Sequence, residues 1–155
     1  MTEEKEFKLL FVPATFSYEW NRKHKIYYCP ISWHNQEFKF FGLYHKKSIR
    51  TISEIETTII AGYDSNSEKL TVHSKGHTVE QIKRLENALI ELDENHFYYK
   101  YYILPENETF EIDFRKTSPG GVRRYRYKDL RDYLTLNDYS DLKGIAEALK
   151  KITWE

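Results

Sequence analysis

The chain has 155 residues, 31% charged and 40% hydrophobic, which suits a single folded domain over residues 1–155 and excludes a disordered protein. No apolar stretch is long enough to cross a bilayer, and the acidic first six residues do not resemble a signal peptide. The single cysteine, Cys29, cannot form an intramolecular disulfide. We therefore expect a cytoplasmic protein with no membrane association.

The net charge is zero, from 24 basic and 24 acidic residues, but the charges are segregated along the chain. Residues 21–50 contain Glu37 as their only acidic residue, and residues 115–131 contain only Asp129, whereas both segments are rich in lysine and arginine. If the two segments meet in the fold, a neutral protein presents a basic face. The alternative is that both are ordinary solvated surface.

Aromatic residues make up 16% of the chain, with 13 tyrosines and 9 phenylalanines, and these residue types favour the pleated surface of a sheet. The pattern of apolar residues and turn residues predicts strands, with prolines ending the first two. They cover residues 7–15, 25–31, 37–45, 49–63, 69–74, 97–104 and 109–116. Residues 122–127 are expected to form a last strand that pairs with 109–116 as a hairpin.

One long helix is clearly indicated. Thr78 with Gln81 three residues later forms a capping box. Apolar residues then recur at helical spacing from Val79 to Leu92. Short helices are expected near residues 129–134 and from Ser140 through Trp154. The pattern predicts an α+β fold in which this helix packs on a strongly curved or barrel-like antiparallel sheet.

The loop at residues 116–121 and the strand after it form the most suggestive segment. Two adjacent glycines allow backbone N–H groups to approach an anion, and arginine forks suit phosphate. Alternate strand positions would place Arg124 and Arg126 on one face. The predicted phosphate contacts are Lys116, Arg123, Arg124 and Arg126. The alternative is a Gly-Gly hairpin turn with exposed arginines.

Two aromatic residues are candidates for stacking on a base, Trp33 in a polar loop and Tyr44 at the end of a strand. Trp20, in an earlier loop, is a weaker candidate, and either tryptophan could instead plug the end of a barrel. The six histidines show no metal-ligand spacing, so no metal or other cofactor is expected. His34 and His45 are flanked by both aromatic and basic residues, which makes them the histidines to test for acid–base chemistry.

The stretch Phe40-Phe41-Gly42-Leu43-Tyr44, followed by a basic turn and an isoleucine-rich segment up to Ile60, resembles PUA-like domains, the superfamily of the EVE, YTH, ASCH and SRA modules. The resemblance implies a small curved barrel with an aromatic-lined pocket for a flipped or modified base. The Gly-Asp turn that opens a barrel strand in EVE domains is missing here. No pocket residue is therefore assigned by the resemblance.

These patterns favour a module that binds nucleic acid or a nucleotide-like ligand. By analogy, such a module fits a prokaryotic defence or counter-defence system. Two other classes stay open. One is a metal-independent phosphodiesterase, which needs a histidine beside an arginine or lysine in one cleft, and the other is a protein-interaction module or inhibitor with a flat tyrosine-rich surface.

Overall fold

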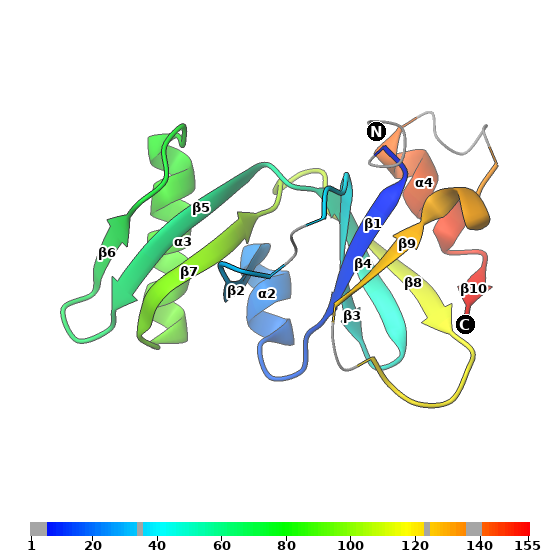
Figure 1. Ribbon diagram of the computed structural model, residues 1–155, viewed down its shortest axis with the longest axis horizontal. Coiled ribbons are helices and arrows are strands. Elements are labelled where there is room, and N and C mark those ends of the chain that lie inside the picture. The colour runs from blue at the N-terminus through cyan, green and yellow to red at the C-terminus, as the bar shows by residue number, and fades with distance from the viewer. Residues whose placement is uncertain (1–5, 34–35, 123–124, 136–140) are drawn as a thin grey trace. The chain divides into compact units, whose positions relative to one another are not determined.

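A computed structural model describes residues 6–33, 36–122, 125–135 and 141–155 (Figure 1). The chain forms two compact units. Unit 1 contains residues 1–18, 36–54 and 105–155, and unit 2 contains residues 19–35 and 55–104. Each unit has its own hydrophobic core. Because the segments of the two units alternate along the chain, no shift in composition marks a boundary between them.

Unit 1 is built on a six-stranded sheet that curls strongly into a half-barrel (Figure 1). The strand order is β10-β8-β4-β3-β1-β9. Its elements are β1 (Lys8–Pro13), β3 (Phe40–His45), β4 (Ser48–Glu54), β8 (Phe110–Lys116), β9 (Arg126–Asp129), the 3₁₀ turn η1 (Leu130–Asp132), α4 (Leu142–Leu149) and β10 (Thr153–Trp154). The core lies on one face of the sheet, where α4 contributes Ile145, Ala146 and Leu149.

Unit 2 is a four-stranded antiparallel sheet in the order β2-β7-β5-β6. It contains β2 (Ile26–Pro30), β5 (Thr57–Asp64), β6 (Lys69–Val72), α3 (Val79–Leu92), β7 (His96–Ile103) and most of α2 (Tyr18–His24). The long helix and its capping box are confirmed: Thr78 accepts from the Gln81 backbone, and Gln81 reaches back to the Thr78 N–H. Leu85, Ala88 and Leu89 of α3 are fully buried in the unit 2 core.

The predicted α+β class and strongly curved sheet are therefore confirmed. In the described residues, no helix is long and apolar enough to cross a membrane. The sheet of unit 1 is mixed rather than wholly antiparallel, because β1 runs parallel to β3 and β10 runs parallel to β8. Period-two patterning shows which residues face the core but does not give the direction of the neighbouring strand.

Two local predictions for the first half of the chain are wrong. Residues 49–63 form two strands, β4 and β5, which belong to different sheets and are separated at Ile55 and Glu56. Trp20 lies in helix α2, not in a loop, and its indole N–H donates to the carbonyl of Ala88 at 2.8 Å. Seven residues are too few to show a helical stripe in the sequence.

Two predictions for the last third are also wrong. The strand after the glycine loop is β9, and it pairs antiparallel with β1 rather than forming a hairpin with β8. The C-terminal helix ends at Leu149, and Trp154 lies on the short strand β10. The helix is capped by Asp141, whose side chain accepts from the Gly144 N–H at 2.7 Å, while Ser140 lies outside the described residues. A long-range strand pairing replaces a local hairpin in the first place and the end of a helix in the second.

Candidate anion-binding site

Strand β9 points two cations at the inner face of the curled sheet. In its register with β1, Arg126 stands opposite Phe11 and Lys128 stands opposite Leu9. Directly paired residues share a face, and Leu9 and Phe11 both belong to the unit 1 core. The alternation that gives a strand two faces therefore puts Arg126 and Lys128 on the face of Leu9 and Phe11 and Tyr127 on the other face, and Lys128 is half-buried there while Arg126, at the start of the strand, stays exposed.

The ammonium group of Lys128 is enclosed by aromatic side chains. Its Nζ lies 3.7 Å from the ring centre of Trp154 and 5.1 Å from that of Tyr133, and it donates to the Tyr133 hydroxyl at 3.0 Å. Burial lowers the pKa of Lys128 to about 8, and the charges of Arg126 and Lys116 act in the same direction, while Asp132 opposes them. An amine that titrates this close to neutrality is typical of a functional site.

Lys116, at the end of β8, holds the glycine loop in place. Its Nζ donates to the carbonyls of Ser118, Pro119 and Gly120 and to the Ser118 hydroxyl, at 2.6–3.2 Å. The side chain is buried, and burial together with Lys47 and Arg126 lowers its pKa. The loop thus turns carbonyl oxygens toward a cation, whereas its two glycines predicted N–H groups facing an anion. We name Lys116, Arg126 and Lys128 the inner cluster.

Tyr44 brings a hydroxyl to the same side of the core. Its ring packs against Phe11 and Trp154 at 6.1 and 6.2 Å, so the ring faces are covered. The side chain is 5% exposed, and its hydroxyl is buried. Burial raises its pKa, while Arg126 and a hydrogen bond from the backbone of Val122 act in the opposite direction. The hydroxyl donates to no acceptor among the described residues, so its hydrogen is a candidate contact for a ligand that accepts hydrogen bonds.

The turn between β3 and β4 places two more lysines beside the inner cluster. Lys46 and Lys47 form a two-residue loop with φ angles of 50° and 63°. Two left-handed residues are required by a type I′ hairpin turn, which prefers Asn-Gly, and lysine there costs roughly 1 kcal/mol per residue. The Lys47 carbonyl accepts from the backbone N–H of Lys116 at 2.8 Å. In Figure 1 this turn and the loop after β8 accordingly lie at the same end of unit 1.

Arg50 fixes the shape of the Lys46–Lys47 turn. Its guanidinium donates to the carbonyls of His45 and Lys46 at 2.9 and 3.1 Å. Its other end reaches Asp113 at 3.4 Å, and Asp113 also accepts from the Ser48 hydroxyl at 2.5 Å. The Ser48 hydrogen bond, then Arg115 and Arg50, lower the pKa of Asp113, so the carboxylate stays charged. The turn is therefore held rigidly in a conformation that its own residues disfavour.

Only some of the predicted site residues come together. Tyr44, Lys116 and Arg126 lie together in unit 1. Trp33 lies in unit 2 just after β2, is 44% exposed, and accepts a hydrogen bond from Lys100 at its carbonyl. The remaining predictions, Arg123, Arg124 and His34, lie outside the described residues.

Two residues of this region, Lys128 and Trp154, were not predicted from the sequence as site residues. Lys128 could have been found by extending the alternation of Arg124 and Arg126 by two residues. Trp154 could not, because its place beside Lys128 depends on β10 and β9 being brought together by the curl of the sheet.

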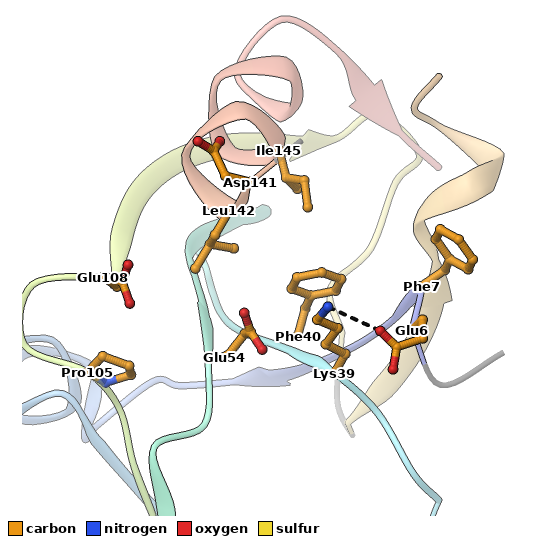
Figure 2. A pocket seen from close by; sticks show the side chains of 10 residues that line it. All are labelled: Glu6, Phe7, Lys39, Phe40, Glu54, Pro105, Glu108, Asp141, Leu142 and Ile145. Atoms are coloured by element: carbon orange, nitrogen blue, oxygen red, sulfur yellow. Dashed lines mark hydrogen bonds and ion pairs between the residues drawn. The ribbon is translucent and has the colours of Figure 1, made fainter. Parts of the chain in front are cut away.

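A pocket of about 730 Å³ in unit 1 carries the opposite charge. Figure 2 shows its wall of Phe40 and Leu142 and three surrounding carboxylates, those of Glu54, Glu108 and Asp141. Lys39, the only basic residue that lines it among the described residues, is paired with Glu6 at 3.1 Å. This pocket repels phosphate, so the candidate anion site is the inner cluster and not the hollow in Figure 2.

Unit 2 has its own pocket, of about 550 Å³, lined by polar side chains that include His73 and His96. His96 is buried and contacts the Tyr101 hydroxyl at 2.6 Å, and burial lowers its pKa. His96 packs between Tyr28 and Tyr99 in a tyrosine cluster, which makes it a packing element of unit 2. Among the residues that the structure describes, no group of three or more His, Cys, Asp or Glu side chains is placed to hold a metal ion.

Comparisons with protein-family models, with curated proteins and with solved structures find no match to the chain. Its function is therefore inferred from the chemistry of its own residues.

Proposed function

We propose that the chain is a binding module for nucleic acid or a nucleotide-like ligand, and that the inner cluster receives a phosphate group. The observation that carries the proposal is the convergence of Arg126 and Lys128, which share one face of β9, with the buried hydroxyl of Tyr44. Arg126 forms no ion pair within the described ranges of the chain. A group of cations with a hydroxyl beside it, in which Arg126 is open to solvent, suits an anion that also accepts hydrogen bonds.

Each residue would have a distinct role. Arg126 offers a planar fork for two phosphate oxygens, and Lys128 adds a point charge from its aromatic enclosure. Tyr44 would donate its hydroxyl, because its ring faces are already covered. Lys116 positions the loop and adds positive potential, since its ammonium hydrogens are occupied within the loop. Base stacking by Trp33 stays a prediction.

A purely structural explanation of these cations also exists. Inward-pointing charges on an edge strand prevent the strand from pairing with other molecules, and β9 is an edge strand. That explanation requires no ligand. It does not account for Arg126, because the charge of Lys128 alone would be enough to prevent such pairing. Measuring the effect of Arg126 on binding separates the two explanations.

Three further expectations from the sequence are compatible with this class of ligand. A PUA-like resemblance implies a base pocket, and a defence or counter-defence role is an analogy. A cytoplasmic location agrees with Cys29, whose thiol is free and buried, with its pKa raised to about 12 by burial. All three remain part of the proposal.

The test is fluorescence anisotropy with a labelled single-stranded oligonucleotide of about 12 nucleotides, at about 50 and 200 mM salt. Wild type should bind and weaken steeply with salt. Arg126→Ala should weaken binding and reduce the slope of log K against log salt by about 0.7. Lys143→Ala is the matched control, because Lys143 is an exposed cation of unit 1 that lies on α4, outside the inner cluster and the Lys46–Lys47 turn. Absence of wild-type binding at the lower salt concentration, or equal loss in both variants, would overturn the proposal.

A further inference from the structure

The Lys46–Lys47 turn has features that the inner cluster does not explain. Both residues are exposed, and neither forms an ion pair within the described part of the chain. Both adopt positive φ angles that lysine disfavours, and the conformation persists because Arg50 and the Lys116 N–H satisfy the turn's carbonyls. A strained conformation that is held by its surroundings suggests a functional position.

The turn and the inner cluster are electrostatically connected but differently exposed. Lys47 is close enough to lower the pKa of Lys116, and its carbonyl is bonded to the backbone of that residue. Lys128, by contrast, is enclosed by Trp154 and Tyr133. The exposed side chains at the tip and the half-buried ammonium group therefore offer a ligand two positions that differ in exposure.

We propose that the Lys46–Lys47 turn is a second phosphate-binding position, so that the ligand is an extended polynucleotide strand and not a mononucleotide. The inference rests on the proposed function, since it adds a neighbouring position to the phosphate at the inner cluster. The strand passes from Arg126 past Lys116 to the tip of the β3–β4 hairpin. The rigid turn presents its lysines without an ordering cost on binding, which is the advantage of a pre-organised site.

Two double variants distinguish the effect of the lysine charges from the effect of the strained backbone of the turn. Lys46→Asn with Lys47→Gly removes both charges and supplies the residues that a type I′ turn prefers. Lys46→Gln with Lys47→Gln removes the same charges and keeps the strain. Lys69→Asn with Lys75→Asn is the matched control, because it removes two exposed charges from unit 2.

Both turn variants should lose affinity for the labelled oligonucleotide, and the salt slope should fall by about 1.4, or about 0.7 for each lysine that no longer neutralises a phosphate. Both should keep wild-type affinity for AMP, measured by competition with a labelled nucleotide. Only the Asn-Gly variant should unfold at a higher denaturant concentration than wild type. The control should keep the wild-type slope.

Oligonucleotide binding that is unchanged in both turn variants, while Arg126→Ala still weakens it, would overturn the second phosphate position and leave the proposed function standing. Wild type that binds AMP as tightly as the oligonucleotide would also overturn it. Wild type that binds neither probe would remove the proposed function itself.

Discussion

The Nζ atom of Lys128 lies 3.7 Å from the ring centre of Trp154, and this contact joins the two edge strands of the curled sheet. Trp154 belongs to β10 and Lys128 to β9, the first and last positions in the strand order. The indole N–H of Trp154 donates to the Phe114 carbonyl at 2.9 Å, which fixes the ring. A desolvated cation–π interaction is worth about 2 kcal/mol and offsets part of the cost of enclosing the charge.

The lowered pKa of Lys128 predicts a pH-dependent stability. Between the folded pKa of about 8 and the usual 10.5, the unfolded state binds more protons at Lys128, so the contribution of this residue to stability rises with pH. The pKa of Cys29, raised to about 12, acts in the opposite direction, so the contribution of Lys128 is read as the difference between wild type and Lys128→Met. From about pH 7 to about pH 9.5, urea unfolding should show the stability of wild type rising relative to that of Lys128→Met. An equal pH dependence in the two proteins would contradict the lowered pKa.

Lys116 is predicted to stabilise the loop rather than to contact the ligand directly. Lys116→Met leaves the carbonyls of Ser118, Pro119 and Gly120 without their buried donor, which is destabilising. The denaturant midpoint should therefore fall well below that of Lys47→Met, which changes an exposed side chain. Equal midpoints would show that the loop does not depend on the Lys116 ammonium group.

The hydroxyl of Tyr44 is predicted to matter more for binding than for stability. It donates to no acceptor among the described residues, so Tyr44→Phe should change the thermal midpoint little while weakening oligonucleotide binding. Tyr127→Phe is the matched control, because its hydroxyl is also buried without an acceptor among the described residues but lies on the other face of β9. Weaker binding in both variants, or in neither, would contradict a role for the Tyr44 hydroxyl in holding the ligand.

The apolar stripe of α3 predicts that alanine substitutions at two adjacent residues lower the unfolding free energy by very different amounts. Leu89 is fully buried, and Ile90 is 42% exposed. Leu89→Ala should cost about 2–5 kcal/mol of unfolding free energy, whereas Ile90→Ala should cost less than about 1 kcal/mol. Chemical denaturation measures both. A small loss of stability for Leu89→Ala would mean that the helix is not anchored through this face.

His45 provides the test of the phosphodiesterase alternative. Its Nδ1 lies 2.7 Å from the Ala14 carbonyl and therefore carries a proton, which leaves Nε2 as the basic nitrogen. Its ring stacks on Tyr18 with 4.0 Å between centres. A binding module should leave RNA and DNA oligonucleotides intact in EDTA. Cleavage by wild type that is lost in His45→Ala would establish an enzyme and contradict a role in binding alone.

The amino-acid sequence by itself determined the elements whose signals are local. The capping box of Thr78 and Gln81 and the stripe down to Leu92 specified α3, because a helix depends on neighbours three and four residues apart. Pro13 and Pro30 end β1 and β2 as expected. The basic run also indicated Arg126, since segregated charge is visible without a fold.

Only the tertiary structure decided which residues meet. The pairing of β9 with β1 put Arg126 and Lys128 on the face of Leu9 and Phe11, and the curl of the sheet brought Trp154 to Lys128. It also gave Lys116 four oxygen acceptors and placed Trp33 in a different unit. The physical reason is that strand pairing joins residues far apart in sequence, and its register is set by which faces can be buried together.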